Sequence, residues 1–226
     1  MSTNQPPVAA RRRQPVPVRL RWALWAGALL IGVGVGAVIK LSQADSPSVS
    51  SAASAPVVTW AAGVRRAPSF SLVDQEGKPF SLASFHGRPV IVTFIDPLCR
   101  DFCPREASIL SQASKELGPA NPAIVSVSVD PWGDTAVNFH EDALHWHLAP
   151  GWRWGVGSEP KLAAVWKSYG IAVIVARKKI AGISVRNITH TGAAYLIDGS
   201  GYERALFLYP FETQDVVSAA RRVLNA

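Results

Sequence analysis

This chain has very little cysteine: its 226 residues include only two, Cys99 and Cys103. Cysteine chemistry must therefore come from this pair alone, and two such residues four positions apart are not expected by chance. Acidic residues are missing from the beginning of the chain, where Asp45 is the first Asp or Glu. No internal repeat is present. The length fits one ordinary domain with additional segments.

The missing acids account for the net charge of +7. Six basic residues precede Asp45, so the rest of the chain carries only about +1. The basic character belongs to the N-terminal segment and not to the surface of a folded domain. A nucleic-acid partner is therefore excluded.

The N-terminal segment has the pattern of a membrane anchor. Residues 1–21 are basic, rich in Pro and Arg, and are expected to be disordered. Residues 22–39 are an 18-residue apolar run without charge, bounded by Lys40, and a helix of this length just crosses a layer of about 30 Å. We expect a transmembrane anchor at 22–40. The preceding arginines predict a cytoplasmic N-terminus, with the domain on the extracytoplasmic or periplasmic side of a bacterial inner membrane.

A cleaved signal peptide is the alternative, with cleavage after the small residues at 42–44 or 51–55. The hydrophobic part of a signal peptide is about 7–15 residues, shorter than this run, which favours the retained anchor. In both cases the domain is exported. Residues 41–64 are rich in Ser, Ala and Pro and predict a flexible tether. The globular domain is expected at 65–226.

Strand and helix patterns alternate through the globular part, which predicts an α/β three-layer sandwich. Asp130 is expected to form a turn, and Asp134 to cap a helix. The basic stretch 177–187 predicts a solvated hairpin. Expected strands are 69–73, 79–82, 90–95, 123–129, 172–176, 193–197 and 203–209, and expected helices are 104–117, 134–146, 159–169 and 212–224.

The cysteine pair lies between the first continuous apolar strand, 90–95, and the helix that begins near Pro104. Such strand ends are where open α/β sheets place their chemistry. A spacing of four puts both sulfurs on one face of a helical turn. Two such thiols can hold a soft metal ion or exchange with a disulfide. A purely stabilising disulfide is less favoured, because so short a loop constrains the unfolded chain little.

Three motifs resemble one family. A strand, a cysteine pair and a Pro-led helix are typical of a thioredoxin-like fold. Cys-x-x-x-Cys-Pro at 99–104, Asp130-Pro131 after the second core strand, and His190 before the strand 193–197 resemble the Sco/SenC (PrrC-like) copper-chaperone family. The resemblance covers about residues 65–224 and implies a thioredoxin-like three-layer α/β/α sandwich. The chain differs from the family pattern at Arg100, where the family often has Pro.

The resemblance implies a membrane-anchored copper chaperone. Cys99, Cys103 and His190 would hold one copper ion, Cu(I) or Cu(II), and deliver it to the copper-binding subunit of a haem-copper (cytochrome c) oxidase. Other copper carriers or thiol reductases are further expected partners. The alternative is a thiol:disulfide oxidoreductase, in which Cys99 and Cys103 act as redox thiols and His190 is not needed.

Other residues are expected to be structural. His140, His145 and His147 belong to a helix or its end, where neighbouring side chains point apart. Trp146, Trp152 and Trp154 are expected in the core. A thiol peroxidase is disfavoured, because its motif requires Thr or Ser where this chain has Asp96.

Overall fold

The computed structural model describes residues 58–226. The predicted basic segment 1–21, the predicted anchor 22–40 and the predicted tether up to residue 57 lie outside the described residues. Among the helices of residues 58–226, none is both long enough and apolar enough to span a membrane.

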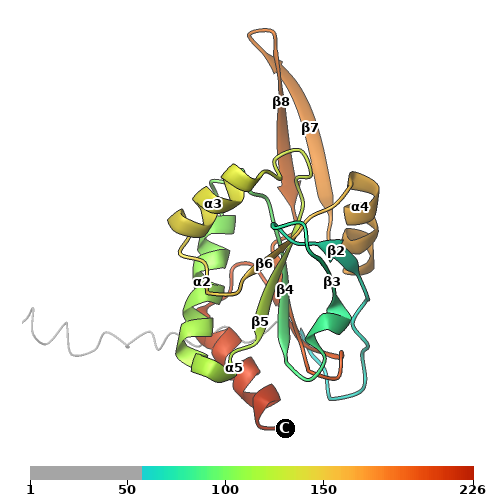
Figure 1. The fold of residues 1–226 in the computed structure, drawn as a ribbon, viewed down its shortest axis with the longest axis vertical. Helices are drawn as coiled ribbons and strands as arrows, with labels where there is room; N and C mark the ends of the chain where they lie inside the picture. Colours follow the sequence, from blue (N-terminus) through green and yellow to red (C-terminus); the bar gives the residue numbers. More distant parts are fainter. Residues whose placement is uncertain (1–57) are drawn as a thin grey trace, which may run out of the picture. The chain divides into compact units, whose positions relative to one another are not determined.

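A six-stranded mixed sheet forms the centre of the domain (Figure 1), with the order β1-β10-β9-β4-β5-β6. β4, β5 and β6 are parallel, whereas β9 is antiparallel to both β4 and β10. Every residue of β4 and β5 is buried, as expected of strands covered on both faces. The strands are β1 (Val58–Thr59), β4 (Val90–Ile95), β5 (Ala123–Ser128), β6 (Arg153–Gly155), β9 (Ala193–Ile197) and β10 (Glu203–Leu208).

Helices lie on both faces of the sheet (Figure 1). One face packs against α2, α3 and α5, and the other packs against α4 and the small β2–β3 hairpin. The helices are α2 (Cys103–Leu117), α3 (Ala136–His145), α4 (Glu159–Ser168) and α5 (Thr213–Leu224), with 3₁₀ turns η1 (Leu82–Phe85) and η2 (Gly118–Ala120); the hairpin is β2 (Ser71–Val73) and β3 (Pro79–Ser81).

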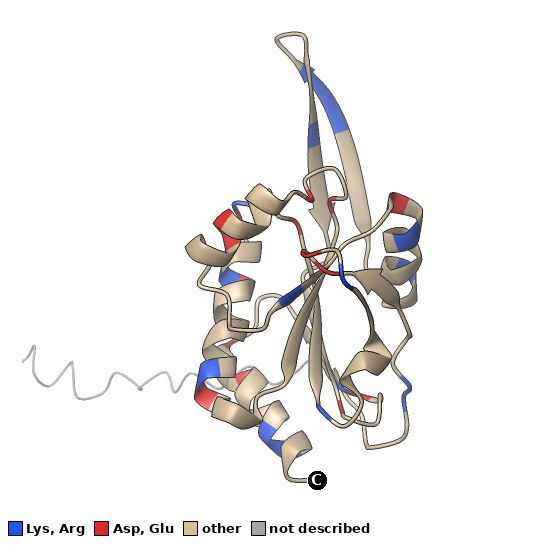
Figure 2. Cartoon of the chain, in the orientation of Figure 1, with Lys and Arg blue, Asp and Glu red and all other residues tan. Residues whose placement is uncertain are grey.

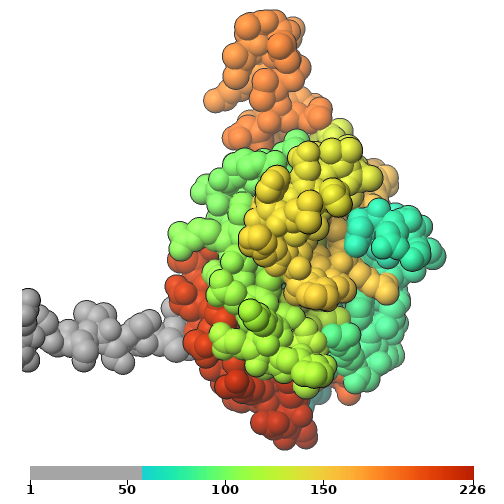
Figure 3. Space-filling model, turned by 60° about the vertical axis from the view of Figure 1, so that its left-hand side comes forward, coloured from blue at the N-terminus to red at the C-terminus, as the bar shows by residue number. Residues whose placement is uncertain are grey.

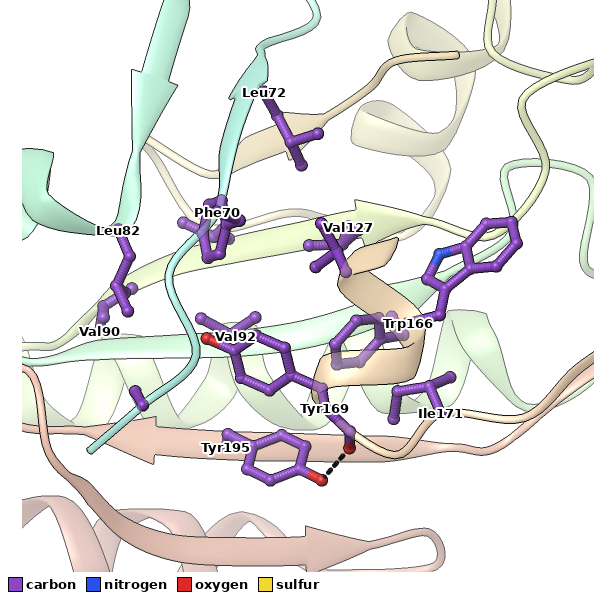
Figure 4. Packing of buried hydrophobic residues seen from close by; sticks show 14 of the residues in the cluster. Phe70, Leu72, Leu82, Val90, Val92, Val127, Trp166, Tyr169, Ile171 and Tyr195 are labelled. Carbon is purple, nitrogen blue, oxygen red and sulfur yellow. Dashed lines mark hydrogen bonds between the residues drawn. The ribbon is translucent and has the colours of Figure 1, made fainter. Parts of the chain in front are cut away.

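The central strands contribute alternate side chains to two hydrophobic clusters. On β4, Val92 and Phe94 pack on the α4 side, and Ile91 and Ile95 pack on the α2 side. Figure 4 shows the α4-side cluster, in which the Tyr195 hydroxyl donates a hydrogen bond to the Tyr169 carbonyl at 2.5 Å. The core is thus contained within the described residues, 58–226, which form one compact unit. We therefore expect this unit to fold by itself.

Helix α2 begins at the second cysteine of the pair. Cys103 is its first residue and Pro104 follows, a residue type favoured in the first helical turn because its missing N–H needs no partner there. Gly118, with φ of 64°, ends the helix. The predicted helix 104–117 is therefore observed with one additional residue.

A long β-hairpin projects from the body of the domain (Figures 1 and 3). It consists of β7 (Val173–Ile180) and β8 (Ile183–His190). Ala181 and Gly182 form the two-residue turn with φ of 50° and 82°, as in a type I′ hairpin. The predicted strand 172–176 and the predicted hairpin 177–187 are parts of this longer ribbon.

Three expectations need correction. The segment predicted as tether up to residue 64 includes β1, which pairs with β10 through Val58↔Leu206; two residues are too few to show a period. The short strand β6 was not predicted for the same reason. Thr135, not Asp134, caps α3, because its hydroxyl accepts a hydrogen bond from Asn138 N at 3.2 Å.

The central strand β9 should carry much of the stability. Leu196 is completely buried in it, so Leu196→Ala should lower the free energy of unfolding by about 2–5 kcal/mol, through lost burial and a cavity. The matched control is Leu208→Ala on neighbouring β10, where the side chain is 39% exposed; it should cost less than about 1 kcal/mol. Urea unfolding of residues 53–226 measures both, and equal losses would contradict this description of the core.

Candidate metal centre

The cysteine pair lies in the loop between β4 and α2. Asp96 organises this loop: its carboxylate accepts a hydrogen bond from Leu98 N at 2.7 Å, and its carbonyl accepts one from Cys99 N at 3.1 Å. Cys99 is half-buried in the loop, and Cys103 is buried at the start of α2. The strand end and the helix start therefore hold one thiol accessible and the other enclosed.

The two thiols are free and interact with each other. A hydrogen bond from the Cys103 thiol, aided by the backbone N–H groups of Asp101 and Cys103, lowers the pKa of Cys99 to about 6. The same hydrogen bond, together with burial, raises the pKa of Cys103 far above its ordinary value. The pair therefore favours a thiolate at Cys99 and a protonated thiol at Cys103. Only the thiolate form is a nucleophile or a metal ligand.

His190, the last residue of β8, reaches the same place. Its Nε2 lies 3.4 Å from Cys103 Sγ, and its Nδ1 lies 3.2 Å from the carbonyl oxygen of Thr191. A carbonyl can only accept, so Nδ1 carries the proton and the unprotonated Nε2 faces the sulfur, where it competes with Cys99 for the single thiol proton of Cys103. Burial lowers the pKa of His190, which keeps the ring neutral. The Phe102 ring packs against the imidazole, with centroids 4.8 Å apart.

The three predicted ligands lie at one place. Cys103 contacts His190, the pKa values of Cys99 and Cys103 are coupled, and Cys99 and His190 line the same cavity of about 590 Å³. Within residues 58–226, no group of three or more His, Cys, Asp or Glu side chains already has an arrangement that would hold a metal ion. The structure therefore brings the expected residues together without closing them into a complete coordination shell.

Acidic side chains lie beside the cysteine loop. Asp96 and Asp130 line the cavity, and Asp134 accepts a hydrogen bond from Ser128 Oγ at 2.6 Å. Burial raises the pKa of Asp96 to about 6 and that of Asp134 to about 7, and the negative charge of Asp130 adds to both shifts. As predicted, Asp130 forms a turn, by accepting a hydrogen bond from Trp132 N at 3.1 Å.

Glu106 was missed in the sequence, although it lies one helical turn after Cys103. It is completely buried and bonded to the Thr93 hydroxyl. That hydroxyl, which has one hydrogen, also contacts the Ala193 carbonyl at 3.1 Å. The hydroxyl can therefore donate its hydrogen to Glu106 Oε1 or to the carbonyl, but not fully to both. Burial raises the pKa of Glu106 to about 7, and the hydrogen bond from Thr93 opposes that shift. A carboxyl three residues after Cys103, on the apolar face of the helix, was the available signal.

Arg100 was not predicted as a site residue either. Its Nη1 donates to the carbonyl oxygens of Cys99 at 2.9 Å and Pro97 at 3.2 Å, and lies 3.5 Å from the carboxylate of Asp142 on α3. Asp142 is buried, which raises its pKa to about 6, whereas the charge of Arg100 opposes that shift. Arg100 thereby connects the cysteine loop to α3.

The remaining candidates have the expected positions. His140, His145 and His147 are exposed on α3 or just after it. Three tryptophans pack in the core, as predicted: Trp146, Trp152 and Trp154. Sequence reasoning therefore separated one histidine at the cysteine pair from three on the surface.

Cys99 should be the reactive thiol of the reduced protein. Its alkylation rate by iodoacetamide should be half-maximal near pH 6, because the thiolate reacts. Replacing Cys103 by Ala removes the main cause of the shift and should move that midpoint towards 9.0, the ordinary pKa of a cysteine thiol. Cys103→Ser, which keeps a hydroxyl donor, should move it less. Mass spectrometry of the alkylated peptides gives the rates, and an unchanged midpoint in Cys103→Ala would contradict the assigned cause.

Glu106 should make stability depend on pH. Its pKa rises from 4.5 to about 7 on folding, so its stabilising contribution is complete below the unfolded value and is lost as the pH rises through about 7. Glu106→Gln should therefore gain about 3 kcal/mol relative to the wild type between about pH 4.5 and about pH 8. Urea unfolding at several pH values measures this difference. Glu116→Gln, at an exposed position of the same helix, should show almost none; equal behaviour of the two variants would disprove the role of burial.

Comparison with known proteins places this geometry in a family. The sequence model of the SCO1/SenC family matches residues 61–225. The chain is 26% identical to the mitochondrial protein SCO2 homolog of Bos taurus, over all of this chain and 84% of that protein. A shorter match, 31% identical, links 41% of the chain to 44% of the chloroplastic peroxiredoxin Q of Populus jackii.

Solved structures show the same fold. Copper-bound ScoI of Bradyrhizobium japonicum has a TM-score of 0.58 and 24% identity, covering 70% of this chain and 99% of that one. BsSco, described as a member of the Sco family of cytochrome c oxidase assembly proteins with a disulfide switch, has a TM-score of 0.56 and 24% identity, covering 71% and 94%. These likenesses confirm the predicted thioredoxin-like α/β domain. Together with the family match over residues 61–225, they lead to one conclusion: this chain belongs to the SCO1/SenC family.

Proposed function

We propose that this protein is a copper chaperone that binds one copper ion through Cys99, Cys103 and His190 and delivers it to the copper centre of a cytochrome c oxidase during assembly. The observation that carries the proposal is the approach of His190 Nε2 to Cys103 Sγ, at 3.4 Å, from positions 87 residues apart. The copper bound to the ScoI relative and the oxidase-assembly description of BsSco support the choice of cargo and recipient.

The protonation states suit the uptake of copper. Two thiolates and one imidazole form a donor set suited to soft Cu(I) that also accommodates Cu(II). Cys99 is already a thiolate and His190 is already neutral, so two of the three ligands need lose no proton. Cys103 must give up its proton when the metal binds. Copper binding should therefore release about one proton from the site.

The cavity suits the release of the ion. Cys99 faces it from the half-buried loop, together with the acidic residues Asp96, Asp101 and Asp130. A soft ligand of the recipient can approach Cys99 first, and the buried Cys103 can part from the metal last. Exchange of one ligand at a time would transfer the ion without releasing it into water.

The second candidate function is thiol:disulfide exchange. The pair combines an accessible thiol of low pKa with a buried thiol that keeps its proton. This asymmetry is typical of an attacking and a resolving cysteine. In this function Cys99 would attack a disulfide of an exported protein and Cys103 would complete the exchange, with no need for His190.

We propose that the domain works outside the cytoplasm, held by the predicted anchor at residues 22–40. The copper-binding subunit of the oxidase would then meet it at the same membrane. Other copper carriers would load the domain, and thiol reductases would keep the cysteines reduced, because oxidised sulfurs do not bind copper.

Copper titration of the reduced domain, residues 53–226, tests the ligand set. We expect one Cu(I) per domain, as measured by competition with a chromophoric chelator. His190→Ala should weaken copper binding by about 100-fold or more. Loss of a residue that only supports a metal ligand costs about 10–100-fold, so a larger loss indicates a ligand. Cys99→Ser and Cys103→Ser should abolish the thiolate-to-metal absorption seen with Cu(II). His140→Ala, at an exposed position on α3, is the matched control and should bind normally.

Two results would reject the proposal. If His190→Ala binds copper as well as the wild type and still exchanges disulfides, the oxidoreductase function replaces the chaperone function. If a deletion strain has normal oxidase activity under copper limitation, the cytochrome c oxidase is not the recipient. Restoration of activity by the wild-type gene, but not by His190→Ala, would support the full proposal.

A further inference from the structure

The two faces of the β7–β8 hairpin differ in character. In the strand register, Val173 pairs with His190 and Arg177 pairs with Arg186. These pairs share one face, called the site face here, because it carries His190 and contacts the body. The opposite face contains the pairs Ile174↔Thr189, Ala176↔Asn187, Lys178↔Val185 and Ile180↔Ile183.

This opposite face is exposed and largely apolar. Four large aliphatic side chains of the hairpin are exposed, and all four lie on it: Ile174, Ile180, Ile183 and Val185. Ile180 and Ile183 flank the turn at the tip and are 59% and 69% exposed. We call this set the apolar face. Exposed aliphatic residues gathered on one face of a projecting element indicate a contact surface.

The hairpin is also strongly basic. Its cations are Arg177, Lys178, Lys179 and Arg186, and no Asp or Glu occurs between residues 160 and 197. Figure 2 shows basic positions and no acidic position along the two strands. Arg177 and Arg186 lie over the ring of Trp132, at 6.0 and 5.1 Å from its centroid. These contacts fix the middle of the ribbon to the body, and Ser184 and Val185 still line the cavity beside Cys99, so the projecting part is the tip, 178–183.

We propose that the tip of the β7–β8 hairpin docks on an anionic lipid surface. Ile180 and Ile183 would enter the boundary between headgroups and acyl chains, as the apolar side of an amphipathic element does. Lys178 and Lys179, two residues or fewer from Ile180, would extend their amines to lipid phosphates. The headgroup region is wet, so the unpaired strand edges keep hydrogen-bonding partners there.

The tether makes this contact accessible. The predicted membrane span ends at Lys40 and the described domain begins at Val58. The intervening segment of about 17 residues can span roughly 60 Å at most, so the predicted anchor would keep the domain near a bilayer. A protein partner would need acidic and apolar groups matched to one narrow tip, whereas an anionic bilayer supplies both at every point of its surface. Charge and tether length together favour the lipid surface.

Docking would set the height of the copper site above the bilayer. His190 is seven residues from Ile183 along β8. At about 3.3 Å per residue, the imidazole would stand roughly 23 Å from the tip. The proposal does not depend on copper binding, because the tip contains none of Cys99, Cys103 and His190.

Vesicle flotation of residues 53–226 tests the docking directly. The wild-type domain should float with vesicles of phosphatidylcholine and phosphatidylglycerol, should float much less with phosphatidylcholine alone, and should dissociate as salt is added. Ile180→Ser combined with Ile183→Ser should weaken flotation by about tenfold or more, because two aliphatic side chains leave the interface. Lys178→Gln combined with Lys179→Gln should remove the preference for the anionic lipid.

The matched control is Val137→Ser combined with Leu144→Ser. These residues on α3 are 64% and 59% exposed. Their substitution removes a similar amount of apolar surface away from the hairpin, so flotation should not change. Circular dichroism and copper titration should show that each variant is folded. Absence of flotation by the wild-type domain, or equal flotation by the isoleucine variant, would overturn the proposal. It would also be overturned if the tip crosslinks to a protein in membranes while bare vesicles fail to bind it.

Discussion

The contact between Cys103 Sγ and His190 Nε2 organises the candidate centre. It joins the first residue of α2 to the last residue of β8, and both elements are positioned by neighbouring strands of one sheet. β4 leads into the cysteine loop, and β9, which pairs with β4, follows His190 after a short link. A loss of this pairing would therefore separate the thiol from the imidazole. The sheet makes the centre a property of the whole fold and not of one loop.

Exclusion of water shifts the pKa values of the acids and of the histidine around this contact in opposite directions. It raises the pKa of Glu106, Asp96 and Asp134 and lowers that of His190, so each of these groups is driven towards its neutral form. Cys99 is the exception, because the hydrogen bond from Cys103 outweighs its partial burial. Of these five groups, the surroundings favour the charged form only for the accessible sulfur of Cys99. A cationic cargo or a disulfide would both meet that sulfur first.

Much of this arrangement could be predicted from the sequence. The apolar runs at 90–95 and 123–129 and the Pro-led helix gave the central elements, because continuous burial and helical spacing leave clear periods. The motif at 99–104 and His190 gave the three candidate ligands. The strands β1 and β6 were not predicted, because two or three residues are too few to show an alternating pattern of apolar and polar side chains. Arg100 was missed because its role depends on a tertiary neighbour, Asp142, that no local pattern reveals. Glu106 was missed although its place on the apolar face of α2 was a local signal; only its partner Thr93 needed the fold.

The alternation of side chains along β8 limits which insertions the β7–β8 hairpin can accept. His190 shares a face with Arg186 because their positions in the sequence differ by an even number, four. Inserting a single residue between them would turn the imidazole to the opposite side of the ribbon, away from the sulfur. Only paired additions, matched on both strands, would preserve the orientation. The hairpin can therefore lengthen only by two residues per strand at a time, which adds about 6–7 Å to its length at each step.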